Sequence, residues 1–403
     1  MEVKLSPPRR AGVPGKDFSL FYIVPLDPVL KDGVEGSMPV KKILKIFFAQ
    51  FLNTSRLVQD LKKDIMDTEF HYYMTGIIAK AAGFSDDEAK TIATASEYVD
   101  ENDVSLKIKD KSGGEAYENY ISQTMNILKP KRKLMRIYPV FHFVPGEPMD
   151  ERASRHDGKM HLLNTTPDNE IANKMLDLSF KASEDTRLCR IGIATHAYAD
   201  TWAHQNFVGW YDFFNDINLD VKPDIGHANA EHHPDWPAHR WEDPRLVNDG
   251  IDNTERFLDA AEKIYGKYQN YNKQMNRKAN TGWKILNSQL INAMGESFSG
   301  SHNYDRDGRI NRYREMAPWL GDFDESEWFK DAIDIKVRGL KDAENGVLSM
   351  FTMLRDKLYW TKGVDKEKTY WYRFQEAVKE HQAKAMEDLD ILFAKMGVNL
   401  HHV

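Results

Sequence analysis

The sequence lacks several features that define other classes of protein. Its one cysteine, Cys189, excludes an internal disulfide framework and a cysteine-rich zinc site. No apolar run approaches the roughly 20 residues of a membrane-spanning helix. The first residues contain no apolar stretch typical of a secretory signal. We therefore expect a cytoplasmic protein, with export by a non-classical route as the alternative.

An excess of basic residues is also missing. The 403 residues include 55 Lys and Arg against 62 Asp and Glu, which gives a formal net charge of −7. This balance argues against a broad nucleic-acid-binding surface, although it does not exclude a local groove. Hydrophobic residues make up 41% and charged residues 29% of the chain, ordinary values for a globular protein. Any metal site must use His and carboxylate ligands.

Helical periodicity predominates along the chain, and few strands are expected, so we predict an all-α fold. Capping residues favour helices over Asp67–Ala82 and Ser85–Asp100. The segment Arg136–Val144 is predicted to be extended, and 215–250 to be a structured loop. Further helices are expected over Val40–Met66, 253–271, 277–298, 327–361 and 366–396.

These elements suggest three parts of the chain. Residues 1–65 form an N-terminal extension that includes most of the basic amphipathic helix Val40–Met66. Such a helix can lie on a membrane or pack on its own domain. Residues 66–300 are predicted to form a metal-binding helical domain with long loops, and residues 301–403 to add C-terminal helices that pack on the same domain.

Potential metal ligands concentrate between Ile191 and Asp235. His196, Asp200 and His204 are spaced by four residues, and on an α-helix each step of four rotates only ~40° from the last. The three side chains therefore project from one face of a helix. His227 and Glu231 repeat the same spacing. The donors His232, His233 and Asp235 follow.

Several His and carboxylate groups in register must share a cation or repel one another, which favours a metal site. The alternative is a buried hydrogen-bond network with Tyr198 and Trp202 as part of the core. Three more polar residues lack an obvious local partner: His71 in an aromatic segment, Asp100 at the end of a helix, and His142 between two phenylalanines.

Taken in order, these residues resemble the ligand series of the zinc-dependent phospholipase C and P1 nuclease superfamily. The series is His71, Asp100, His142, His196-x3-Asp200-x3-His204 and His227-x3-Glu231. The spacing of Asp200 and His204 is similar to that in the zinc-dependent domain of glycosylphosphatidylinositol phospholipase D. The segments FHYY, HAYADTWAHQ and IGHA also resemble an uncharacterised bacterial family.

The resemblance implies a multi-helix bundle that holds two or three Zn²⁺ ions between its helices. It assigns Asp100, His142, His196 and Asp200 to one zinc, and His204, His227 and Glu231 to a second, with Asp235 and His232 as competitors of Glu231. His71 with a bridging Asp200 would hold a third. The superfamily completes this third site with the amine of its mature N-terminus. About 70 residues precede His71 here, so that ligand is missing unless the chain is processed near Met66. Asp67 or Glu69 is a substitute, and a dinuclear site is the other alternative.

The implied activity is phosphodiester hydrolysis by a metal-activated water that Asp100 orients or deprotonates. We expect phospholipase C-like cleavage of phospholipid head groups, with peripheral membrane contact by the basic helix. A P1-type nuclease acting on single-stranded nucleic acid is the second candidate. A metal-stabilised helical scaffold without catalysis is the third, and there protein groups would fill every metal position.

Overall fold

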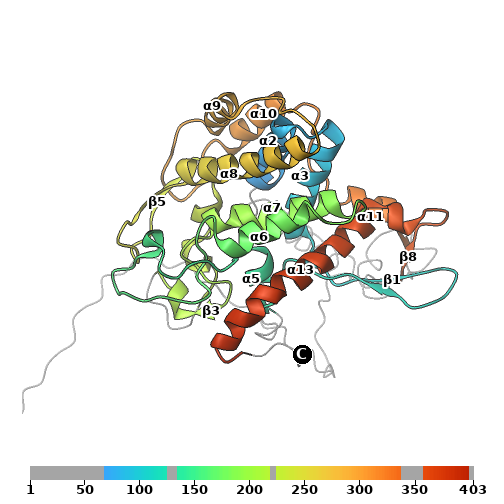
Figure 1. Ribbon diagram of the computed structural model, residues 1–403, viewed down its shortest axis with the longest axis horizontal. Coiled ribbons are helices and arrows are strands. Elements are labelled where there is room, and N and C mark those ends of the chain that lie inside the picture. Colours follow the sequence, from blue (N-terminus) through green and yellow to red (C-terminus); the bar gives the residue numbers. More distant parts are fainter. Residues whose placement is uncertain (1–67, 125–133, 218–223, 337–356, 399–403) are drawn as a thin grey trace, which may run out of the picture. The chain divides into compact units, whose positions relative to one another are not determined.

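Helix α7 (Arg187–Ala203) lies at the centre of the structure, and other helices surround it. Its residues from Cys189 to Ala203 are all buried. It packs against α3 (Asp86–Glu101), α6 (Glu170–Ser179), α8 (Asn253–Gln274) and α13 (Tyr370–Lys395). Figure 1 shows α6, α7 and α13 crossing the middle of the view, with α8, α9 (Trp283–Met294) and α10 (Arg306–Met316) above them. A helix enclosed in this way needs small residues where its neighbours approach.

The computed structural model describes residues 68–124, 134–217, 224–336 and 357–398. These residues belong to one unit that spans Ser55–Val403. The predicted extension 1–65 and the amphipathic helix Val40–Met66 lie outside the described residues. Within the described part of the chain, no helix is both long and apolar enough to cross a membrane.

Local capping chemistry determines where two of the N-terminal helices begin and end. Ser85 accepts a hydrogen bond from the Glu88 backbone, and the Glu88 side chain accepts one from the Ser85 backbone. This reciprocal pair starts α3 as predicted. Helix α2 (Thr75–Ala82) ends at Gly83, whose φ of 114° is readily adopted only by glycine. The C-terminal helix α13 also falls within its predicted range.

Two segments have a conformation that differs from the predicted one. The segment preceding α2 is a π-helix, η1 (Glu69–Met74), in place of a continuous α-helix from Asp67. The segment predicted to be extended at Arg136–Val144 contains the short helix α5 (Tyr138–Phe141). Pro139 lies in the first turn of α5, where its missing N–H costs nothing and its fixed φ suits a helix.

The all-α prediction is wrong in one respect, because the mainly helical fold includes a small sheet. Its strand order is β2-β1-β8-β7, with β1 (Lys107–Lys109) antiparallel to β2 (Tyr117–Glu118) and parallel to β8 (Lys357–Trp360). Strand β7 (Ile333–Lys336) pairs antiparallel with β8. Of the helix predicted over 327–361, the described residues contain α11 (Glu327–Ala332), and they turn to strand at β7 and β8, while 337–356 lie outside the described residues.

The predicted loop at 215–250 contains short turns and paired strands. Strand β3 (Tyr211–Asp212) pairs with β4 (Asp224–Ile225), and β5 (Arg240–Glu242) pairs with β6 (Gly250–Asp252). Two 3₁₀ turns, η4 (Ala228–Ala230) and η5 (His233–Asp235), lie between them. Further 3₁₀ turns are η2 (Glu151–Ala153), η3 (Phe213–Asn215) and η7 (Lys366–Lys368).

Gly192 allows α3 and α7 to approach closely. A Cβ atom at this position would meet the carbonyl oxygen of Ile92, and would lie 2.7 Å from Ala95 Cβ and 2.9 Å from the Ser96 backbone nitrogen. These atoms belong to the α3 backbone or lie next to it, so they cannot move aside as a flexible side chain could. The spacing of α3 and α7 therefore depends on the absence of a side chain at residue 192.

Replacing Gly192 with Ala should destabilise the protein by about 1–3 kcal/mol, the usual cost of overpacking a core. Gly266→Ala is the matched control, because Gly266 lies within helix α8 and no atom lies within 4 Å of a Cβ built there. It should raise the free energy of unfolding by about 0.5–1 kcal/mol through helix propensity. Urea unfolding of both variants measures the difference, and equal effects at the two positions would contradict the close-approach argument.

Candidate metal centre

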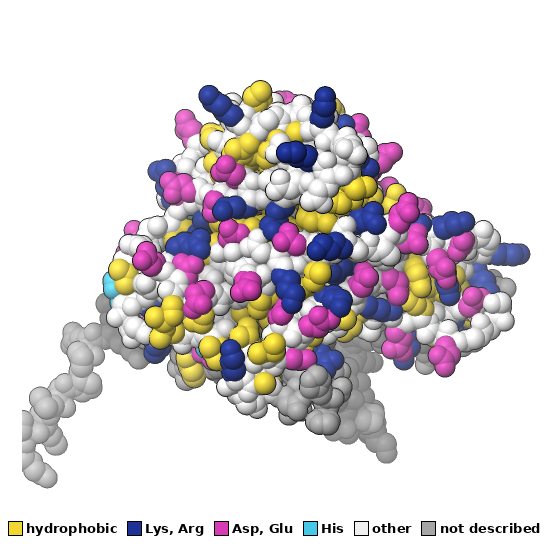
Figure 2. Space-filling model, viewed as in Figure 1, with side chains coloured by type: hydrophobic (Ala, Val, Ile, Leu, Met, Phe, Trp, Pro, Cys, Tyr) yellow, Lys and Arg dark blue, Asp and Glu magenta, His cyan; other side chains and the backbone are white. Residues whose placement is uncertain are grey.

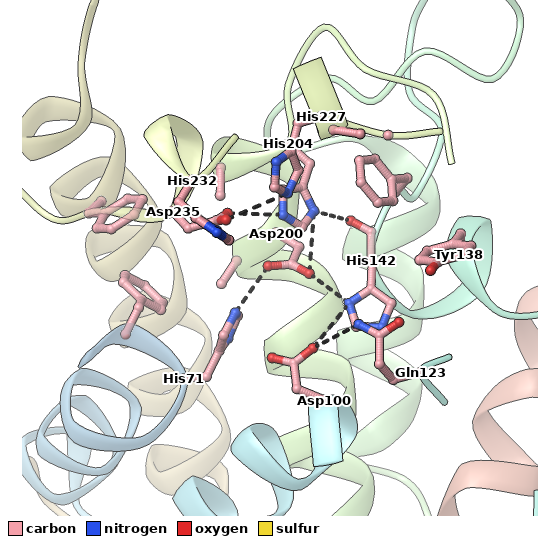
Figure 3. A pocket seen from close by; sticks show the side chains of 17 residues that line it. His71, Asp100, Gln123, Tyr138, His142, Asp200, His204, His227, His232 and Asp235 are labelled. Carbon is pink, nitrogen blue, oxygen red and sulfur yellow. Dashed lines mark hydrogen bonds and ion pairs between the residues drawn. The ribbon is translucent and has the colours of Figure 1, made fainter. Parts of the chain in front are cut away.

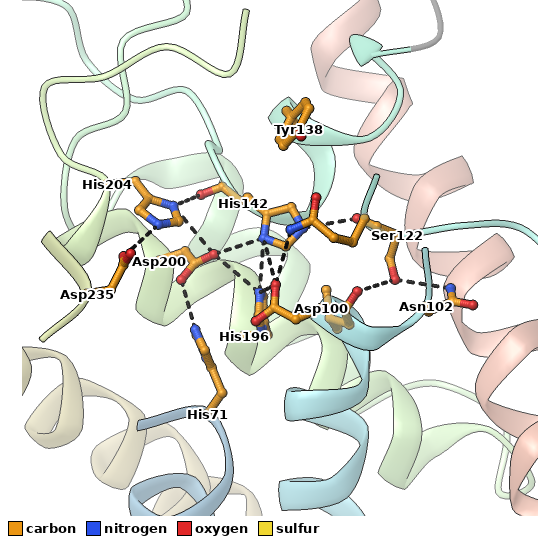
Figure 4. A network of polar contacts seen from close by, with 12 residues as sticks. His71, Asp100, Asn102, Ser122, Tyr138, His142, His196, Asp200, His204 and Asp235 are labelled. Atoms are coloured by element: carbon orange, nitrogen blue, oxygen red, sulfur yellow. Dashed lines mark hydrogen bonds and ion pairs between the residues drawn. The ribbon is translucent and has the colours of Figure 1, made fainter. Parts of the chain in front are cut away.

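Four histidines surround the carboxylate of Asp200, which is only 2% exposed. Asp200 Oδ1 lies 3.1 Å from His71 Nε2. Asp200 Oδ2 lies 3.2 Å from both His142 Nδ1 and His196 Nε2, and 3.5 Å from His204 Nδ1. Figure 4 shows these rings converging on the two carboxylate oxygens. Asp200 therefore lies between histidines of different segments, where a bridging ligand would need to be, and its bridging role stays a prediction.

The candidate ligands come from segments that are far apart in the sequence. His196 and Asp200 lie on the last two turns of α7, and His204 is the C-cap of that helix. His71 comes from the π-helix η1. Such helices are rare in proteins, but those that occur are often found at functional sites. His142 caps the C-terminus of α5. The four-residue spacing places His196, Asp200 and His204 side by side, as predicted. The elements η1 and α5 bring His71 and His142 to the same place.

Asp100, His142 and His196 form a first group of potential ligands, and all three are buried. Asp100 Oδ1 lies 3.6 Å from His142 Nδ1 and 3.7 Å from His196 Nε2. The two histidine nitrogens are 3.1 Å apart. The second ring nitrogen of His142, Nε2, lies 3.0 Å from the carbonyl oxygen of Ser122. This contact fixes the ring so that Nδ1 faces the other ligands.

His204, His227 and Asp235 form a second group. Asp235 lies 3.3 Å from His204 Nε2 and 3.6 Å from His227 Nε2, and the two rings stack at 4.8 Å. The predicted ligand Glu231 does not take part, because its side chain is exposed. Only its backbone carbonyl contacts the group, 2.8 Å from His227 Nδ1. Asp235 replaces Glu231 as the carboxylate of this group.

His71, His196 and Asp200 form a third group, which shares His196 with the first group. Asp200 also contacts His142 of the first group and His204 of the second. The rings of His71 and His196 stack at 3.8 Å. Glu69, one predicted substitute for a missing ligand here, is bound elsewhere. Its carboxylate lies 2.7 and 2.8 Å from Nε and Nη2 of the buried Arg309. The other substitute, Asp67, lies outside the described residues.

The donor chemistry of the three groups fits divalent cations. Within each group the ligand atoms lie within 4.8 Å of one another, and each group combines imidazole nitrogens with a carboxylate oxygen. That combination suits Zn²⁺ in particular. Nδ1 of both His71 and His196 is buried without a hydrogen-bond partner, which shows that the cluster is not a fully satisfied hydrogen-bond network.

The carboxylates strongly perturb the histidines of the cation-free cluster. Burial alone lowers the pKa of His71, but the nearby carboxylate of Asp200 outweighs it and raises the pKa to about 10. Burial also lowers the pKa of His204, but the carboxylates of Asp200 and Asp235 outweigh it and raise the pKa to about 9. Burial raises the pKa of Asp200, but the surrounding histidines hold it well below its usual range. At neutral pH the imidazoles of His71 and His204 would therefore carry positive charge when no cation is bound.

A cavity of about 260 Å³ contacts members of all three groups. Figure 3 shows Asp100, Asp200, His204 and Asp235 facing it from several sides. Sequence reasoning missed Gln123, whose side chain donates a hydrogen bond of 3.4 Å to Asp100 Oδ1. It also missed the aromatic wall of the cavity, because these residues meet only in the folded chain. The wall consists of Phe70, Tyr138, Phe143 and Phe257.

Comparison with known proteins places the chain in a family. Residues 66–389 match the model of a family of unknown function, DUF6765. The chain belongs to this family. The matched region contains all three ligand groups of the DUF6765 chain, from His71 to Asp235. No curated protein and no solved structure matches it. The resemblance to zinc-dependent phospholipases and nucleases therefore remains a prediction.

We expect the purified chain to contain at least two equivalents of zinc, because three ligand groups lie within one cluster. Asp200→Asn should lose more metal than Glu231→Gln, since Asp200 contacts four histidines whereas the Glu231 side chain is exposed. Elemental analysis after purification without added metal measures both. Less than about half an equivalent in the wild type, with no gain on zinc addition, would refute the metal centre. Full metal content in Asp200→Asn would refute the bridge.

The cation-free protein should lose stability as the pH rises from about 6.5 to about 10. A histidine with a raised pKa contributes stability that is fully present below its unfolded value of 6.5 and is lost as the pH rises through its folded value, here about 10 for His71 and about 9 for His204. Thermal melts in the presence of a chelator measure this. The zinc-loaded protein should show a smaller decline, and a flat profile without zinc would contradict the proton assignment.

Proposed function

We propose that this protein is a zinc-dependent phosphodiester hydrolase. The observation that carries the proposal is that three His and carboxylate groups, linked through Asp200 and His196, meet at one cavity. A structural metal site would be closed by protein groups on every side, whereas a catalytic site keeps a position open to a substrate. The cavity beside Asp100, Asp200 and Asp235 supports the catalytic alternative over the scaffold.

The chain's own residues suggest how the work is divided. Bound zinc ions would lower the pKa of a water molecule and neutralise the charge of a phosphate group. Asp100 lines the cavity and is held by Gln123, so it is placed to orient a water molecule or accept its proton. Asp200 holds the histidines of neighbouring groups at fixed separations. The aromatic wall limits the access of other water molecules.

The cavity favours a small phosphodiester group as the substrate. Among the described residues that line it, none is Lys or Arg, so the negative charge of a phosphate would be balanced by the metal ions. A nuclease that follows a polyanion usually adds a positive groove. Figure 2 shows Lys, Arg, Asp and Glu interspersed over the visible face, without a broad area of one sign. These features support a phospholipid head group as the substrate.

A P1-type nuclease is the second candidate, and the aromatic wall is the observation that favours it. Tyr138 and Phe143 lie on one side of the cavity, with ring centroids 6.0 Å apart. A single unstacked base could lie against such rings, because stacking requires no charged partner. The two candidates differ in what they predict for salt, since binding of a polyanion weakens steeply as salt concentration rises.

The zinc-loaded protein should release phosphorylated head group from phospholipid faster than it releases nucleotide from single-stranded DNA or RNA. Asp100→Asn should lower the rate per bound zinc by about 10²-fold or more, the usual contribution of an acid or base. Asp157→Asn is the control, because Asp157 forms ion pairs with Arg155 and Lys159 outside this cavity. Faster nucleotide release would favour the nuclease, and inactivity of fully loaded protein on both substrates would favour the scaffold.

A further inference from the structure

Glu97 is a buried carboxylate near the candidate metal centre, and it belongs to none of the three ligand groups. It lies on α3, one turn before Asp100, and is 2% exposed. The Thr68 side chain hydrogen-bonds to the carboxylate, but its Oε2 atom is buried without a partner. Asp100 and His71 are the charged groups that affect it most. A buried carboxylate oxygen without a donor is costly and calls for an explanation.

His71 has the complementary deficiency. Its Nε2 atom faces Asp200 at 3.1 Å, whereas Nδ1 on the other side of the ring is buried and has no hydrogen-bond partner. A histidine that binds a metal through one nitrogen almost always donates its other N–H to a carboxylate, a carbonyl or a water molecule. Glu69, which neighbours His71 on η1, is committed to Arg309. Among the described acidic residues that act on His71, Glu97 has a buried carboxylate oxygen without a hydrogen-bond partner.

We propose that Glu97 is a positioning residue for His71 when the cluster holds cations, and that it accepts the Nδ1–H of His71 directly or through one water molecule. This role rests on the proposed metal centre. The hydrogen bond would satisfy both atoms at once and would fix the ring so that Nε2 points at the cation beside Asp200. Glu97 would also add a fourth carboxylate to Asp100, Asp200 and Asp235, which strengthens attraction for divalent cations.

Zinc titration of the full-length chain tests this role, with Glu97→Gln compared with Glu101→Gln. Glu101 lies on the same helix and its substitution removes the same charge, but its side chain is only partly buried. Glu97→Gln should weaken the most sensitive zinc-binding step by roughly tenfold or more, the usual effect of removing such a partner. Glu97→Asp, which keeps the charge on a shorter side chain, should lie between the wild type and Glu97→Gln.

Two further measurements separate positioning from a purely structural role. Thermal melts of the zinc-free proteins should show Glu97→Gln at least as stable as the wild type, because a buried charge has been removed. In zinc-loaded wild type, nuclear magnetic resonance should detect a slowly exchanging proton on His71 Nδ1. That proton should exchange faster in Glu97→Gln and remain protected in Glu101→Gln.

The outcomes distinguish this role from the metal centre itself. A wild-type chain that binds no zinc would overturn the metal centre, and the role of Glu97 with it. A wild type that binds zinc, with Glu97→Gln equal to it in affinity and in His71 exchange, would overturn the role of Glu97 alone. A Glu97→Gln chain that fails to fold without zinc would show that the residue is structural, and the absence of a protected proton in loaded wild type would agree with that.

Discussion

The buried carboxylate of Asp200 is the constraint on which the rest of the site depends. Its two oxygens face histidines from η1, α5 and α7, so these segments must all reach one point inside the protein. That requirement explains why α7 is enclosed and why several of its residues are small. Gly192 brings α3 close enough for Asp100 to stand beside His196, and Ala199 and Ala203 leave room for the cavity. The close packing of α3 on α7 therefore also determines the geometry of the site.

The parts of the site that could be predicted from the sequence are those governed by helical spacing. His196, Asp200 and His204 lie on one helix, so a four-residue step was enough to place them together. The same rule failed for His227 and Glu231 because no α-helix joins them. His227 precedes the short turn η4, and Glu231 follows it with a positive φ of 51°. That reversal directs the chain so that Asp235 reaches the ligands and Glu231 does not.

The fold shows the same division between local and long-range information. Capping residues start α3 at the expected position, since Ser85 and Glu88 act within four residues. The sheet escaped prediction because its strands are short and β1 pairs with β8, about 250 residues later. A π-helix has nearly the same apolar pattern as an α-helix over one or two turns. The unusual element that carries His71 therefore leaves no distinct trace in the sequence.

Side-chain burial divides the candidate metal centre into an inner part, far from solvent, and an outer part that a substrate would reach first. The side chains of His196 and Asp200 are 0% and 2% exposed, whereas those of His227 and Asp235 are 19% and 15% exposed. Cations held by the first and third groups would be enclosed by α3, α7 and η1. A cation held by His204, His227 and Asp235 would lie nearer to solvent, beside the turns η4 and η5. A substrate entering from solvent would meet this outer group first, while Asp100 would act from the inner side of the same cavity.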